Sequence, residues 1–286
     1  MLIASRAIPL CKDSLPEEPP MIIEELQRNA FAVFSQFDIS NHSVLVETAM
    51  RFTVALWVSY PQQLPPACNM VQLAKLVNVA LDPQVHDVHV AIRVGQSFVA
   101  HLMRLLSDQQ LQDLKREGVY KKLRGLLSYY SVISPDQLQQ IVVGVGMFAE
   151  LKPLPSEPPE TYLSEDIHTH LLSAAQKHYS YTVLQQLIWR LLSLLCQRDG
   201  DFAKHLVSVD VLSSIVTTMQ REGSHLTPLL RFLTVCCHTV PTFIQNCLEK
   251  EELMQSLLGV IRTDSVSSTL EDVANTCDFI AFLCSK

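Results

Sequence analysis

Residues 181–219 read YTVLQQLIWRLLSLLCQRDGDFAKHLVSVDVLSSIVTTM, and residues 225–260 read HLTPLLRFLTVCCHTVPTFIQNCLEKEELMQSLLGV. When the first segment is shifted by 41 residues it falls on the second, because apolar residues then meet apolar residues. The matched pairs are Trp189 with Leu230, Cys196 with Cys237, Phe202 with Phe243, Leu212 with Leu253, and Val216 with Leu257. A fixed period of this length, built from helical patterns, predicts stacked helical repeats that share one core.

The composition also favours helices. Hydrophobic residues make up 48% of the 286 residues, which is ample material for a continuous core, and only 8 residues are glycine. Apolar residues recur at helical spacing along most of the chain. We therefore predict an all-α fold.

The chain divides into four segments by composition. Residues 1–20 are rich in proline and acids and are predicted to be a flexible lead-in, and residues 21–151 to be divergent helical repeats. Residues 152–166, KPLPSEPPETYLSED, are predicted to be a connector loop, with a P-x-x-P binding segment or a phosphorylation site at Ser164 as alternatives. Residues 167–286 contain the clear repeats.

Turn and capping signals place several helix ends. Ser107 is expected to cap a helix that runs to Arg116, and Gly118 to break the chain after it. Ser134 and Pro135 are expected to begin another helix, since proline suits the first helical position. One long helix is expected over roughly 85–106.

Each repeat is predicted to contain a long, a short and a medium helix, at 181–198, 200–207 and 210–221 and again at 226–239, 241–249 and 252–262. The IWRLLSLL and LLRFLTV runs, with FAKHLVSVDVLSSIV and FIQNCLEKEELMQSLL after them, resemble the armadillo branch of the armadillo/HEAT family. A fainter copy covers 85–130, in which Glu117-Gly118-Val119 is similar to the family's turn. The resemblance implies a right-handed α-solenoid.

The resemblance also implies a concave partner groove. The inner-face positions are Arg190, Ser193, Arg231 and Thr234, with His101 and Arg104 in the fainter copy. Peptide-binding armadillo proteins carry asparagine at the positions of Ser193 and Thr234, and this chain does not. The difference disfavours a peptide clamp like that of import receptors or catenins.

The last predicted helix, residues 266–284, resembles the third helix of a repeat without a capping helix after it. An uncovered face is expected from Phe279, Ile280, Phe282 and Leu283. This face would dock a partner, or the chain would be a segment or isoform of a longer protein or part of a larger complex.

The net charge of −7 disfavours direct nucleic-acid binding. The exception is a basic patch with five residues: Lys115, Arg116, Lys121, Lys122 and Arg124. A solvated helix face is favoured there over a phosphate site. No signal peptide or membrane span is predicted, so the cytoplasm or nucleus is expected.

No pattern indicates catalysis, and we expect no cofactor or metal. The eight cysteines form no C-x-x-C pair and are expected to be buried small apolar residues. His86 and His89 share a helix face but lack a third ligand, and the pair His168 and His170 is a weaker candidate. An enzyme with a site built across repeats remains the least favoured alternative.

These observations predict a non-enzymatic scaffold or adaptor that binds protein partners. A nuclear, chromosome-associated assembly factor is the alternative. The stretch YTVLQQLIWRLLSLLCQRDGDFAKHL resembles the vertebrate meiosis inhibitor protein family, which implies a role in forming meiotic DNA breaks.

Overall fold

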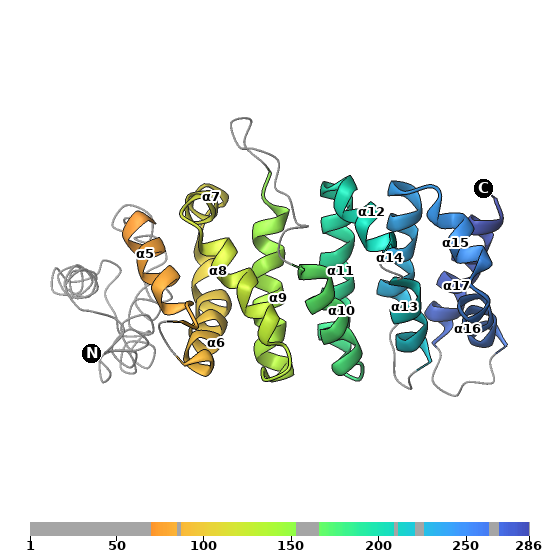
Figure 1. The fold of residues 1–286 in the computed structure, drawn as a ribbon, viewed down its shortest axis with the longest axis horizontal. Coiled ribbons are helices and arrows are strands. Elements are labelled where there is room, and N and C mark those ends of the chain that lie inside the picture. Colours follow the sequence, from red (N-terminus) through yellow and green to blue (C-terminus); the bar gives the residue numbers. More distant parts are fainter. Residues whose placement is uncertain are drawn as a thin grey trace, which may run out of the picture. The chain divides into compact units, whose positions relative to one another are not determined.

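All regular elements that the structure describes are helices, in agreement with the predicted all-α class. The computed structural model describes residues 70–84, 87–152, 166–208, 211–220, 226–262 and 269–285, and no strand occurs in these ranges (Figure 1). The predicted lead-in at 1–20 and most of the 152–166 loop lie outside the described residues.

The chain forms two compact units that divide after Leu126. In the first unit, helix α5 packs against its neighbours, and a π-helical turn over Phe98–Leu102 follows α6. The long helix expected over 85–106 is therefore α-helical only to Ser97 and continues as a π-helical turn and a 3₁₀ turn to Leu105. The helices of this unit are α5 (Met70–Ala80), α6 (Val88–Ser97), α7 (Asp108–Arg116) and α8 (Val119–Gly125).

The predicted helix starts and turns are confirmed. Ser107 caps α7 in a capping box with Gln110, and Ser134 caps α9 in the same way with Gln137. Gly118 has a φ of 87°, a left-handed conformation that glycine adopts without strain, and it separates α7 from α8.

In the second unit, four long helices pack side by side in chain order, each against the next. They are α9 (Pro135–Glu150), α11 (Thr182–Arg198), α14 (Leu226–Thr239) and α17 (Leu270–Cys284). A second row packs in the same way and contains α10 (Ile167–Lys177), α13 (Val211–Met219) and α16 (Glu251–Ile261).

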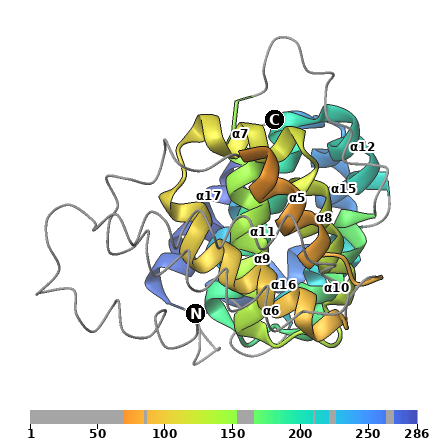
Figure 2. The ribbon, with the colours of Figure 1, turned by 90° about the vertical axis from the view of Figure 1, so that its left-hand side faces the viewer.

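Two short helices complete the second unit, α12 (Gly200–Ser208) and α15 (Phe243–Glu249). Figure 1 and Figure 2 place both toward the same edge of this unit. Three helices thus occur in each repeat, as α11–α12–α13 and α14–α15–α16, which confirms the helices predicted from the repeat. The predicted order of long, short and medium holds for α14–α15–α16, whereas α12 and α13 are both 9 residues long.

The core of the second unit follows the 41-residue period. Both members of each matched pair are buried, and none is more than 6% exposed. Trp189 of α11 packs on Phe232 of α14 with ring centroids 5.4 Å apart. The equivalent apolar positions of the two repeats therefore bury their side chains together.

Some of the cysteines in the described residues are buried and others are exposed, and Cys11 and Cys68 lie outside the described residues. Cys196, Cys236, Cys237 and Cys247 are buried free thiols, as predicted for small apolar residues. Cys277 and Cys284 are exposed on α17, so the prediction is wrong for these two.

Candidate functional site

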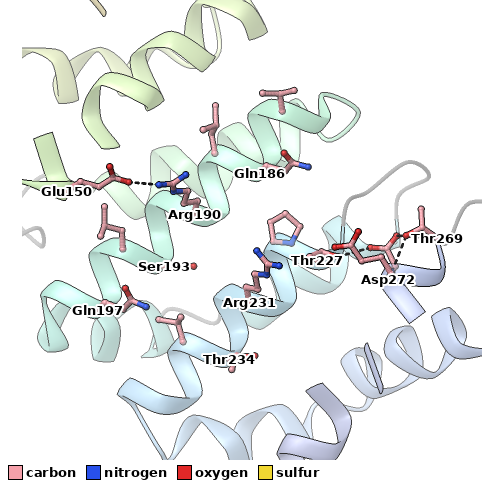
Figure 3. A pocket seen from close by; sticks show the side chains of 16 residues that line it. Glu150, Gln186, Arg190, Ser193, Gln197, Thr227, Arg231, Thr234, Thr269 and Asp272 are labelled. Atoms are coloured by element: carbon pink, nitrogen blue, oxygen red, sulfur yellow. Dashed lines mark hydrogen bonds and ion pairs between the residues drawn. The ribbon is translucent and has the colours of Figure 1, made fainter. Parts of the chain in front are cut away.

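A groove of about 1000 Å³ opens over the row of long helices in the second unit (Figure 3). Glu150 at the end of α9 lines one end, and Thr269, Glu271 and Asp272 at the start of α17 line the other. Its volume lies at the upper end of the range of ligand pockets, about 300–1000 Å³.

The two walls come from α11 and α14. The α11 wall contains Val183, Gln186, Leu187, Arg190, Ser193, Leu194 and Gln197. The α14 wall contains Thr227, Pro228, Arg231, Thr234 and Val235. The four inner-face residues that were predicted from the repeat, Arg190, Ser193, Arg231 and Thr234, thus line one groove.

Arg190 is paired inside the groove. Its Nη2 lies 2.7 Å from Oε1 of Glu150, with the two side chains 73% and 50% exposed. Arg198 lies eight residues after Arg190 on α11 and donates hydrogen bonds to the backbone carbonyls of Glu150 and Leu151. These contacts hold the end of α9 against α11 and place Glu150 beside Arg190.

Arg231 is exposed, and its guanidinium has no ion pair or hydrogen bond with any residue that the structure describes. It occupies on α14 the position that Arg190 occupies on α11. Figure 3 shows its side chain between Arg190 and the start of α17. This guanidinium is available for an anionic group of a ligand.

Ser193 and Thr234 stand at the two positions where peptide-binding armadillo proteins carry asparagine, and their hydroxyls bond to their own helices. Ser193 Oγ donates to the Trp189 carbonyl at 2.8 Å, and Thr234 Oγ1 donates to the Leu230 carbonyl at 2.9 Å. Neither is a free donor toward the groove, because the single hydroxyl hydrogen is used. A ligand backbone would find only acceptors at these two positions.

The acidic end of the groove is held in place by hydrogen bonds. Asp272 is 8% exposed and accepts hydrogen bonds from Thr269, which caps α17, and from Thr227 Oγ1 at 3.3 Å. Asn275 donates to the same Thr227 hydroxyl. These bonds join the start of α17 to α14.

Sequence reasoning missed the glutamines of the groove. Gln186 and Gln197 are exposed, and their amides have no hydrogen-bond partner among the described residues. Helical spacing could have found them, because they lie four residues before and seven after Arg190 on the same face. Glu150 and Asp272 come from other helices, so spacing along α11 could not have found them.

His101 and Arg104 do not line the groove, which the second unit builds alone. Arg104 is an exposed residue of a 3₁₀ turn over Met103–Leu105 in the first unit. His101 lies in the π-helical turn before it, and its side chain lies outside the described residues.

The basic patch is largely engaged within the first unit. Lys122 Nζ lies 2.6 Å from Asp82, and Arg116 lies 3.3 Å from Asp113. Lys115 and Arg124 lie over the ring of Tyr120. Lys121 is exposed and has no such contact within the described chain. This arrangement agrees with the favoured interpretation, a solvated helix face.

The predicted uncovered face of α17 is wrong for two of its four residues. Phe279 and Leu283 are 3% and 1% exposed and pack inward, while the ring of Phe282 lies tilted against that of His238 of α14, with centroids 5.0 Å apart. Ile280 is half-buried. Phe279 and Leu283 lie one turn apart and face the core, whereas Ile280 is turned about 100° from Phe279 and is less covered. The outward side instead carries Leu270, Ala274, Cys277, Ala281 and Cys284.

Two neighbouring histidines lie away from the groove, of which His168 is buried and His205 is half-buried. His168 of α10 lies 4.8 Å from His205 of α12, ring to ring, and its Nδ1 has no partner among the described residues. Burial, and then the nearby His205, lower the pKa of His168. His168 and His170 do not form a metal site, since no group of three ligands occurs in the described ranges. His86 lies outside them.

No helix within the described residues is long and apolar enough to cross a membrane. No protein-family model, curated protein or solved structure matches the chain.

Proposed function

We propose that this chain is a non-enzymatic scaffold or adaptor that binds a protein partner in the groove between α11 and α14. The observation that carries the proposal is Arg231. Its exposed guanidinium has no partner in the described chain and is flanked by the groove's apolar residues, such as Pro228 and Val235. Interfaces commonly combine an arginine anchor with apolar surroundings.

An armadillo-like right-handed solenoid is part of the same proposal. The repeated set of three helices and the two packed rows support it. In such an array the long helices present one continuous binding surface. The nuclear role in meiotic break formation stays a prediction from the sequence.

Affinity purification with the full chain tests the proposal. The proteins bound by the unchanged chain are compared with those bound by Arg231→Glu and by a control, Lys204→Glu. Both variants replace a cation by glutamate and so make the same charge change. Lys204 is a suitable control because it is exposed on α12 and does not line the groove. Loss of specific proteins only with Arg231→Glu is expected. An unchanged set of proteins with both variants would contradict the groove proposal.

A further inference from the structure

We propose that the groove takes an extended, proline-rich peptide with two acidic side chains three residues apart and a basic side chain after them. This inference rests on the proposed function and names the chemistry of the ligand. It starts from the order of charges along the groove, which follows the order of the packed helices.

From one end of the groove to the other, the charged residues are acidic, then basic, then acidic. Glu150 stands at the end of α9, Arg190 on α11, Arg231 on α14, and Glu271 with Asp272 at the start of α17. Figure 3 shows the labelled members in this order. A complementary ligand presents carboxylates to the two arginines and a cation toward α17, because opposite charges must meet across an interface.

The spacing of the two arginines selects the ligand's conformation. Arg190 and Arg231 occupy equivalent positions on neighbouring helices, and packed helices lie about 8–10 Å apart. In a polyproline II helix, residues i and i+3 lie on the same side at about 9 Å, from three residues per turn and about 3.1 Å per residue. Two acids at this spacing therefore match the separation of the two neighbouring helices that carry the arginines.

The polar groups of the groove also favour this conformation. The hydroxyls of Ser193 and Thr234 donate their hydrogens to carbonyls of their own helices. No row of side-chain donors is therefore left at these positions to bind the backbone of an extended ligand. A polyproline II backbone keeps its own solvation and needs no such ladder. Prolines of the ligand can lie on the apolar surface of Val183 and Pro228, while Gln186 offers an amide to a ligand carbonyl.

Binding of defined peptides to the full chain tests the inference by fluorescence anisotropy. The probe is GEPPEPPKG, and its composition-matched control is GPEEPPPKG, in which the acids are adjacent. We expect the probe to bind at least about tenfold more tightly than the control, and Arg231→Glu to weaken it by at least about tenfold, since reversal turns attraction into repulsion. Lys204→Glu should leave binding unchanged.

A charge exchange gives a gain-of-function test. The double variant Arg190→Glu with Arg231→Glu should lose GEPPEPPKG and bind GKPPKPPKG, which keeps the lysine toward the unchanged acidic end at α17 and which the unchanged chain does not bind. The circular dichroism spectrum of each variant confirms that it is folded. Both arginines are exposed groove residues, so the variants are expected to fold.

Equal binding of the two acidic peptides, or retention of GEPPEPPKG by the double variant, would overturn the inference. The proposed function fails separately. If Arg231→Glu removes cellular proteins but no acidic peptide binds with the expected spacing, the groove is a binding site and only the ligand chemistry is wrong. If neither experiment responds to Arg231→Glu, both proposals are wrong.

Discussion

Arg190 and Glu150 form an ion pair across α11 and α9, with Nη2 and Oε1 2.7 Å apart. Both side chains remain half or more exposed, so water competes for each charge. Exposed pairs of this kind contribute about 0–1 kcal/mol to stability. The pair is therefore easily exchanged for a ligand carboxylate and shields Arg190 until a ligand binds.

Replacement of Glu150 by glutamine should change binding more than stability. The free energy of unfolding is expected to change by no more than about 0.5 kcal/mol, because Arg198 still bonds to the backbone carbonyl of residue 150. The affinity for an acidic peptide should rise, because Arg190 no longer has an internal carboxylate. Urea denaturation and fluorescence anisotropy measure the two effects.

Glu252→Gln is the matched control for this change, because Glu252 is exposed on α16 and does not line the groove. It removes the same charge from the chain. If both variants raise peptide affinity equally, the effect comes from net charge, and the Arg190–Glu150 pair has no special role.

Gln185 should be far more important for stability than its neighbour Gln186. Gln185 is 1% exposed, donates to the carbonyls of Ala175 and His178 at 2.7 and 3.1 Å, and accepts from Trp189 Nε1 at 3.1 Å. Gln185→Leu removes all three bonds, and the His178 carbonyl then keeps only its bond from the Tyr181 backbone N–H. The loss should cost about 2–4 kcal/mol, measured by urea denaturation.

Gln186→Leu tests the same substitution one residue along α11. Gln186 is exposed, so the free energy of unfolding should change by less than about 0.5 kcal/mol. Equal losses for the two variants would show that the Gln185 network does not stabilise the contact between α10 and α11.

Periodicity was enough to predict the helices of the second unit. The matched apolar pairs identify the buried sides of α11 and α14 because a helix repeats its faces every 3.6 residues. The same rule places Arg190 and Arg231 on one side. Local capping chemistry, as at Ser134, fixed helix starts equally well.

The partners of these residues could not be predicted, because they come from other helices. Glu150 reaches Arg190 across 40 residues of chain, and Asp272 reaches Thr227 across 45. Such contacts depend on how helices pack and on the side-chain conformers chosen there. The π-helical turn after Ser97 likewise has no pattern in the sequence that we recognised.

Stability should fall as the pH drops below about 6.5. The pKa values of His168 and His178 are both lowered in the folded chain, chiefly by burial. Above a pH of about 6.5, the two histidines are neutral in both the folded and the unfolded chain, so their titration does not affect stability. Below this pH the unfolded chain binds more protons than the folded chain, which favours unfolding. Thermal denaturation between pH 7.5 and pH 5 would show this as a falling midpoint.

His168→Leu should flatten this pH dependence, and the double variant with His178→Leu should flatten it further. His89→Leu provides the control for the substitution itself, because His89 is exposed. A slope that survives the double variant would assign the effect to other groups.

Asp272 should stabilise the junction between α17 and α14. Its carboxylate accepts from Thr269 Oγ1 at 2.8 Å and from Thr227 Oγ1 at 3.3 Å, and it completes the capping box of α17. Asp272→Ala removes both links and should cost about 1–2 kcal/mol of unfolding free energy. Hydrogen exchange should be fastest in the first turns of α17, where the unbonded amides then lie.

Asp278→Ala is the comparison for that loss, because Asp278 is exposed on the same helix and outside the groove. It removes the same charge but no cap, so unfolding free energy should change by less than about 0.5 kcal/mol. Asp272→Asn separates charge from hydrogen bonding: its side-chain oxygen can still accept from Thr269, so it should recover part of the loss. If Asp278→Ala and Asp272→Ala cost the same, α17 is held by its apolar contacts through Phe279 and Leu283 rather than by the cap.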